Sequence, residues 1–313
     1  MLCCCKNVKV KKFTNNHTIE PEYTFCKMKF ATHSLHSTIY MCEESKTKTK
    51  CICKQINLHR NTMNEINILK KLKNSNSGYF PKYMYHTKID KSTVSIYYEY
   101  IPGKDLFQTF FQDFSMIPKF EKVIDLAKNM LYCVIELQKY NLMHIDIKLE
   151  NFIFDMHNNK LYLIDFEGCQ KIPPGNRIGD MGTFLTTKNY VPPEIWFKIG
   201  HKNTDIWNIG ICLWLLLTRQ YPFYTSSVRS TILLYKNSTH FKKYDQFTKK
   251  MEYDIIKKCK VVYKFPTNEH SNQLLKIKNY NKLLEMFAQI FTLEPNDRIT
   301  AKQLLKMISN MLI

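Results

Sequence analysis

Hydrophobic and polar positions alternate with a period of two along several short stretches near the start of the chain. The stretches are residues 25–30, 37–42 and 51–56. Such alternation is typical of strands in an antiparallel sheet that buries one face. The pattern changes at residues 62–73, where apolar side chains recur at helical spacing. The first hundred residues therefore predict a small antiparallel sheet with one helix.

From about residue 106 onward the pattern becomes mainly helical. Residues 120–140 place apolar side chains on one broad face, which predicts a long helix with a buried side. Two short apolar runs follow at residues 152–154 and 161–164, with the turn 157–159 between them. Apolar runs separated by an asparagine-rich turn predict a β-hairpin.

Composition limits the class of protein. A chain of 313 residues with 44% hydrophobic and 13% aromatic residues can bury a large core, in one two-lobed domain or two small ones. The longest apolar run, residues 209–217, is about half of the roughly 18 residues that span a bilayer. There is no secretory leader pattern, and the 11 cysteines lack paired C-x-x-C spacing. We therefore expect a cytoplasmic protein with reduced thiols.

The formal net charge of +19 comes almost entirely from lysine. Arginine occurs only five times. It is the residue that most often recognises DNA bases and binds phosphates through two hydrogen bonds. The lysines are also dispersed along the chain. This pattern disfavours a specific nucleic-acid function and favours an acidic substrate, an acidic partner or a membrane surface.

Three adjacent cysteines, Cys3, Cys4 and Cys5, lie near the start of the chain with several lysines behind them. An acyl chain combined with a basic patch is the usual requirement for stable membrane anchoring. Leu2 in place of glycine excludes myristoylation. Two interpretations stay open, namely S-acylation with membrane association and incidental thiols in a frayed tail.

Chemistry concentrates in the stretch from His144 to Asn151 and in the stretch from Leu163 to Gly168. The predicted hairpin brings Asn151 and Asp165 to neighbouring strand ends. Both side chains offer oxygen atoms, which Mg²⁺ prefers together with substrate phosphates. Asp146 is then left to accept a proton from a hydroxyl, and Lys148 to neutralise a phosphoryl group. These groups suit phosphoryl transfer, where positioning and charge stabilisation supply most of the catalysis.

The pattern H-x-D-x-K-x-x-N followed by D-F resembles the catalytic and metal-binding loops of eukaryotic protein kinases. Small-molecule kinases of the choline and aminoglycoside type share this pattern. Their metal loop often reads I-D-F-E, as residues 164–167 do here. The rest of the chain has to distinguish the two groups.

Three later signals favour the protein kinases. They are P-P-E ending at Glu194, D-I-W-x-x-G starting at Asp205, and R-x-T starting at Arg298. The resemblance implies that Glu194 pairs with Arg298 and that Asp205 braces the catalytic-loop backbone. It covers about residues 23–308, and the chain is identified as a member of the eukaryotic protein kinase superfamily, of the serine/threonine type, with a degenerate glycine-rich loop.

The resemblance implies an α+β, two-lobed fold. A small lobe, residues 23–101, would hold an antiparallel sheet and one helix. A larger, mainly helical lobe would follow at residues 102–313, with a basic insertion near residues 224–264. Residues 1–22 would form a basic, cysteine-containing tail.

The resemblance also assigns the site. Lys54 held by Glu65 would grip the phosphates of ATP, and Asn151 with Asp165 would hold Mg²⁺ or Mn²⁺. Asp146 would be the base, Lys148 would stabilise the transferring group, and Thr187 would bridge these two. The nucleotide site would be lined by Ile39, Ile52, Glu99, Ile101, Asp105 and Ile153, with Tyr98 behind it. Protein substrates would be the partners.

Three departures from the family pattern affect these expectations. The frame of the glycine-rich loop, residues 32–37, contains no glycine. Ile145 replaces the arginine that pairs with a phosphate on the switch segment, so we expect activity without phosphorylation of Thr183, Thr186 or Thr187. Glu167 replaces a glycine and adds a third carboxylate near the metal.

Two functions remain after these departures. The first is a protein kinase that transfers the ATP γ-phosphate to serine or threonine of protein substrates. The second is a catalytically silent scaffold of the same fold, because the phosphate loop is degenerate. The complete set of charged residues favours the enzyme, since drift would have removed at least one of them.

Overall fold

The structure, a computed structural model, describes residues 7–9, 24–33, 37–44, 47–58, 60–112, 118–172, 174, 187, 189–197, 200–222 and 280–311. Several features discussed above lie outside these residues. They are Cys3 to Cys5, residues 34–36 of the phosphate-loop frame, Thr183, Thr186 and the basic insertion. The expectations about them stay predictions.

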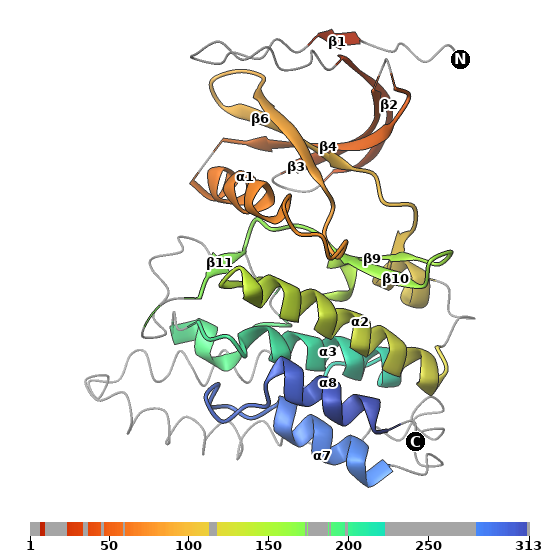
Figure 1. The fold of residues 1–313 in the computed structure, drawn as a ribbon, viewed down its shortest axis with the longest axis vertical. Helices are drawn as coiled ribbons and strands as arrows, with labels where there is room; N and C mark the ends of the chain where they lie inside the picture. The colour runs from red at the N-terminus through yellow and green to blue at the C-terminus, as the bar shows by residue number, and fades with distance from the viewer. Residues whose placement is uncertain are drawn as a thin grey trace. The chain divides into compact units, whose positions relative to one another are not determined.

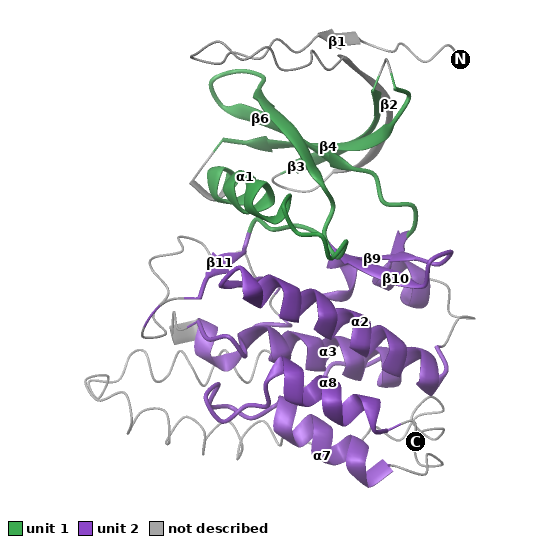
Figure 2. Cartoon of the chain, in the orientation of Figure 1, with its two compact units in different colours: residues 1–103, 164–167 green, residues 104–163, 168–313 purple. Residues whose placement is uncertain are grey.

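The chain divides into two compact units, which Figure 2 shows in different colours. The first unit comprises residues 1–103 and 164–167, and the second comprises residues 104–163 and 168–313. The division falls after Gly103, where the sequence predicted a lobe boundary after Ile101. It also groups Asp165 with the first unit, although the residues on both sides of its short segment belong to the second.

The described residues of the first unit form a six-stranded sheet and one helix (Figure 1). The strands are β1 (Asn7–Lys9), β2 (Thr24–His33), β3 (Ser37–Glu44), β4 (Lys50–Asn57), β5 (Tyr83–Lys88) and β6 (Thr93–Glu99). Their order is β1-β2-β3-β4-β6-β5, and all neighbours are antiparallel. Helix α1 (Arg60–Leu72) follows β4. The predicted sheet with one helix is confirmed.

Strand register separates the two faces of this sheet. Cys42 lies opposite Cys51, and Cys53 lies opposite Tyr97, so these side chains share one face. They form a buried core cluster in which the Tyr85 and Tyr97 rings stack with centroids 4.4 Å apart. The alternate residues of β4 point to the other face, and Lys54 is among them.

That second face carries the residues predicted to surround a nucleotide. Ile39 lies opposite Lys54, and Ile52 lies opposite Tyr98. Helix α1 buries Ile66, Leu69 and Leu72, the apolar positions that predicted it, together with Glu65. A glutamate buried on this helix needs a cation as its partner, because an unpaired buried carboxylate is strongly unfavourable.

Two small sheets and several helices make up the described part of the second unit. Strands β10 (Lys160–Leu163), β9 (Phe152–Asp155) and β7 (Lys104–Asp105) form one sheet, and β11 (Gln170–Lys171) pairs with β8 (Leu142–Met143) in the other. The main helices are α2 (Phe120–Lys139), α3 (Thr204–Thr218), α7 (Tyr280–Ile290) and α8 (Ala301–Ser309). A π-helical turn (Gln108–Gln112) and 3₁₀ turns at Leu149–Asn151 and Pro193–Phe197 complete the described elements.

The predicted hairpin is confirmed in this unit. Phe152 pairs with Leu163 and Asp155 pairs with Lys160. The Asp155 carboxylate accepts hydrogen bonds from the backbone N–H groups of His157 and Asn158, which closes the turn. Strand pairing therefore extends from the turn to Phe152, the residue that directly follows Asn151.

Helix α3 is the core of the second unit, because every one of its residues is buried. It contacts both α2 and α7. Trp207 and Trp214 of α3 meet the Phe291 ring edge-on. Gly210 permits this approach, since a β-carbon there would lie 2.9 Å from Phe291. Among the described residues, no helix is both long and apolar enough to cross a membrane.

Candidate active site

The first unit brings Lys54 together with three carboxylates. The Lys54 ammonium donates to the two oxygens of Glu65 at 2.9 and 3.1 Å and to the Asp165 carboxylate at 2.8 Å. The Glu167 carboxylate lies 3.8 Å from the same nitrogen. The predicted pairing of a strand lysine with a helix glutamate is therefore present.

Burial and charge shift the pKa values in this group. Burial lowers the pKa of Lys54, but the carboxylates of Asp165 and then Glu65 outweigh it and raise that pKa well above its ordinary value. Burial raises the pKa of Glu65 to about 7 against the opposing Lys54 ammonium, and the charges of Asp165 and Glu167 add to the rise. The single Lys54 ammonium faces three carboxylates. Glu65 is the most buried of the three, so its ionised form is the least favoured.

The contact of Glu167 with Lys54 was not foreseen from the sequence. From the sequence we expected Glu167 to add a third carboxylate near the metal, either to help hold cations or to crowd them. The oxygens of Glu65, Asp165 and Glu167 lie within 4.8 Å of one another around the lysine. The only sequence signal was the substitution of a glycine by a charged residue immediately after the aspartate.

The second unit assembles Asp146, Lys148 and Thr187. The Lys148 ammonium donates to Asp146 at 2.7 Å and to the Thr187 hydroxyl at 2.9 Å. The other Asp146 oxygen accepts from the Thr187 backbone N–H at 2.7 Å. Thr187 thus bridges the aspartate and the lysine, as the resemblance implied.

Asn151 is tied to the same loop. Its side-chain nitrogen donates to the Asp146 backbone carbonyl at 2.8 Å. This orientation assigns the amide nitrogen to the loop and leaves the amide oxygen as the atom suited to a cation. The Asp165 carboxylate of the first unit is 37% exposed. The Asn151 amide oxygen and the Asp165 carboxylate are hard oxygen ligands, the type that Mg²⁺ and Mn²⁺ prefer.

Asp205 braces the catalytic loop from inside. Its buried carboxylate accepts the backbone N–H groups of His144 and Ile145, each at 2.8 Å. Ile145 has a φ of 70°, a left-handed conformation that β-branched residues rarely adopt. The two charge-assisted hydrogen bonds help to hold this backbone, so the predicted role of Asp205 is confirmed. His144 is fully buried, as expected of a core histidine.

The side chain of Ile145 lies in an apolar cluster. Met143, Ile145 and Ile195 are fully buried together, and Ile172 and Val191 pack against them. The segment that follows Thr187 is therefore held against the catalytic loop by hydrophobic contact at the position where the family has an arginine.

Glu194 and Arg298 form the predicted buried ion pair. The guanidinium makes two parallel contacts with the carboxylate, at 2.6 and 2.9 Å. It also donates to the backbone carbonyls of Thr292, Asn203 and Leu293. The pair links residues 104 positions apart and anchors the segment that carries Thr187 to the helical core.

The remaining residues assigned to the nucleotide lie at distinct places in each unit. Ile39, Ile52, Glu99 and Ile101 belong to the sheet of the first unit or to its exit. In the second unit, Asp105 of β7 pairs with Ile153 of β9. The Asp105 carboxylate accepts from the Gln108 backbone N–H at 2.7 Å. Their roles toward ATP stay predictions.

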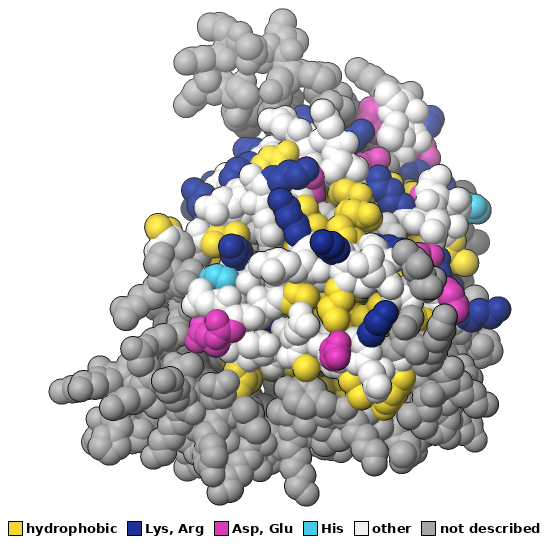
Figure 3. Space-filling model, turned by 60° about the horizontal axis from the view of Figure 1, so that its bottom comes forward, with side chains coloured by type: hydrophobic (Ala, Val, Ile, Leu, Met, Phe, Trp, Pro, Cys, Tyr) yellow, Lys and Arg dark blue, Asp and Glu magenta, His cyan; other side chains and the backbone are white. Residues whose placement is uncertain are grey.

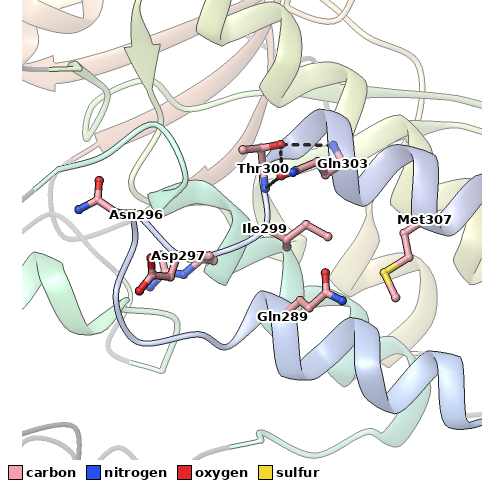
Figure 4. A pocket seen from close by; sticks show the side chains of 8 residues that line it. Gln289, Asn296, Asp297, Ile299, Thr300, Gln303 and Met307 are labelled. Atoms are coloured by element: carbon pink, nitrogen blue, oxygen red, sulfur yellow. Dashed lines mark hydrogen bonds between the residues drawn. The ribbon is translucent and has the colours of Figure 1, made fainter. Parts of the chain in front are cut away.

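Two further features do not involve the predicted catalytic residues. A cavity of about 580 Å³ between α7 and α8 is lined by polar side chains such as Gln289 and Gln303, with Met307 beside them (Figure 4). Thr300 caps α8 by accepting from the Gln303 backbone N–H at 3.3 Å. None of the predicted catalytic residues lines this cavity. On the face drawn in Figure 3, the described lysine and arginine side chains lie in several separate places.

The two-unit fold with these side-chain groups defines a protein kinase domain. A family model described as "Protein kinase domain" matches residues 35–308, so the chain belongs to this family. The match decides between protein kinases and small-molecule kinases in favour of the former.

Several of the similar curated proteins are named as serine/threonine-protein kinases. The chain is 31% identical over 136 residues to Serine/threonine-protein kinase Nek3 of Mus musculus, which covers 43% of this chain and 26% of that protein. It is 33% identical over 167 residues to Probable serine/threonine-protein kinase fnkB of Dictyostelium discoideum, covering 52% and 30%. Probable serine/threonine-protein kinase MARK-B of the same organism is 28% identical over 202 residues, covering 64% and 26%. The chain thus aligns with less than a third of each of these relatives.

Proposed function

We propose that the protein transfers the γ-phosphate of ATP to serine or threonine side chains of protein substrates. The observation that carries this proposal is the Asp146 group. One carboxylate there holds both the Lys148 ammonium and the Thr187 backbone at 2.7 Å. A preorganised carboxylate beside a lysine and a threonine suits a hydroxyl that must be oriented, deprotonated and joined to a phosphoryl group.

Asp146 accepts the proton of the attacking hydroxyl at its carboxylate. Lys148 places positive charge where negative charge develops on the transferred group. Lys54 orients the phosphates of ATP, because Glu65 holds its flexible side chain in one place. Asn151 and Asp165 would hold Mg²⁺ or Mn²⁺, which neutralises phosphate charge when it is bound.

The inactive-scaffold alternative is not favoured. A protein released from catalysis has no need to keep a buried lysine paired with a buried glutamate, because such pairs contribute little to stability against a hydrophobic replacement. The pair is retained here together with Asp146, Lys148 and Asn151. The absence of glycine from the phosphate-loop frame is expected to weaken binding of the ATP phosphates. It does not remove the reacting groups, Asp146 and Lys148.

A preference for basic residues near the target hydroxyl follows from two more carboxylates of the second unit. Burial raises the pKa of Glu150, Lys148 opposes the rise, and Asp105 and Asp146 add to it through like charge. Burial also raises the pKa of Asp105. A lysine or arginine of the substrate would relieve this crowding of negative charge.

The experiment is transfer of radiolabelled γ-phosphate to a peptide array with Mg²⁺, compared with Asp146→Asn. Asp125→Asn on α2 is the matched control, because Asp125 takes no part in the site. We expect label on serine and threonine peptides with neighbouring basic residues, a loss of about 10²-fold or more in Asp146→Asn, and no loss in Asp125→Asn. Transfer absent from the wild type, or equal in Asp146→Asn, would overturn the proposal.

A further inference from the structure

Glu167 is a charged residue beside Lys54 that the proposed mechanism does not use. Its carboxylate lies 3.8 Å from the Lys54 ammonium, and its side chain is 15% exposed. Lys54 and Glu65 are more buried still, at 6% and 2%. Glu167 is therefore part of the partly desolvated surroundings of the lysine, where charges interact more strongly than at a surface.

Backbone geometry aims Glu167 at the lysine. Asp165 has a φ of 64°, and the residue after it, Phe166, packs edge-on against Phe80 with ring centroids 5.7 Å apart. Because Phe166 points into the apolar interior, the residues on either side of it face Lys54 together. A glycine at position 167 would offer no side chain there.

The three carboxylates around Lys54 differ in their access to solvent. Asp165 is 37% exposed, whereas Glu65 and Glu167 are largely buried. Asp165 is the carboxylate that the proposed function assigns to a metal ion. A metal ion held by Asp165 would compete with Lys54 for this carboxylate, whose 2.8 Å contact is the shortest that the ammonium makes with the three.

We propose that Glu167 is a positioning residue for Lys54, which with Glu65 holds the lysine ammonium in place when the Asp165 carboxylate serves a metal ion. Two buried carboxylates then share the lysine, where a glycine at position 167 would leave one. The second carboxylate offsets the weaker nucleotide grip that we expect from a phosphate-loop frame without glycine. This inference rests on the proposed function.

The test measures ATP affinity at saturating Mg²⁺ in Glu167→Gln and Glu167→Ala, by calorimetric titration that needs no turnover. Glutamine keeps an oxygen that can accept from Lys54, whereas alanine keeps none. We expect dissociation constants to rise roughly three- to tenfold, more for alanine, as expected for loss of one partly buried charge partner. KM for ATP should rise similarly, with kcat changed by less than about twofold.

The matched control is Glu43→Gln, since Glu43 of β3 pairs with Lys48 at 3.6 Å and lies outside the Lys54 group. A double-mutant cycle with Glu65→Gln measures the coupling between the two substitutions in ATP affinity. No such coupling is expected if Glu167 only stabilises the fold. We expect the double variant to bind ATP more weakly than the product of the single effects, because either carboxylate can hold the lysine.

The inference fails if Glu167→Ala binds ATP as the Glu43→Gln control does, or binds it more tightly. Strict additivity with Glu65→Gln would also overturn it. Wild-type turnover, measured in the same preparations, separates this failure from failure of the proposed function. If the wild type transfers phosphate and Glu167→Ala binds ATP with the same affinity, the role of Glu167 is refuted and the proposed function is not.

Discussion

Replacing Arg298 by methionine tests the buried ion pair that anchors the switch segment. The Arg298 side chain is fully buried and that of Glu194 is 3% exposed, so removal of the guanidinium leaves a carboxylate charge without its partner. Breaking a buried pair in this way costs about 3–5 kcal/mol. Three backbone carbonyls also lose their donor. This loss is a large part of the roughly 5–15 kcal/mol that stabilises a typical domain.

The assay is urea unfolding followed by tryptophan fluorescence, because the Arg298 guanidinium lies 5.2 Å from the Trp207 ring centroid. We expect Arg298→Met to lower the unfolding free energy by about 3–5 kcal/mol. The double variant with Glu194→Gln should recover at least about 1 kcal/mol of it, since the unpaired charge is gone. Lys302→Met, an exposed change on α8, should stay within about 0.5 kcal/mol of wild type. An Arg298→Met loss no larger than that control would refute the reasoning.

Three further predictions concern the loop and the lysine group. Asp205→Ala leaves two buried N–H groups without an acceptor, so unfolding experiments should show a loss of about 2–5 kcal/mol, and a loss below about 1 kcal/mol would contradict the bracing role. Turnover should survive phosphatase treatment, because the apolar cluster of Ile145 and Ile195 holds the switch segment; a loss of turnover would show that a phosphate is needed. The raised pKa of Glu65, about 7 against 4.5, means that its contribution to stability is present below about pH 4.5 and lost as pH rises through about 7. Wild type should thus lose roughly 3 kcal/mol relative to Glu65→Gln over that range, and parallel pH profiles would contradict this.

Residue order and spacing were enough to predict the contacts built on family motifs. The pairs Lys54–Glu65 and Glu194–Arg298 were both expected, and both are present at hydrogen-bonding distance. Alternation of apolar and polar residues predicted the strands of the small sheet, although strand β4 buries residues on both faces, such as Cys53 and Ile56. Chemistry limits which charged residues can occupy the motif positions, so their contacts can be predicted from the sequence.

Contacts at departures from the motif could not be predicted in the same way. The approach of Glu167 to Lys54 depends on the left-handed turn at Asp165 and on the packing of Phe166. Likewise, Ile145 signalled a missing arginine, but not the apolar cluster that takes its place. Such contacts depend on backbone direction and on the shape of neighbouring side chains, which a single sequence does not specify.

In the proposed function, Lys54 binds the nucleotide and Asp146 carries out the transfer. The most direct measurement is ATP affinity together with turnover in Lys54→Met and Asp146→Asn. We predict that Asp146→Asn keeps the wild-type affinity within about threefold while its turnover falls about 10²–10⁴-fold. Lys54→Met should lose both affinity and turnover. Wild-type affinity in Lys54→Met, or wild-type turnover in Asp146→Asn, would contradict the account.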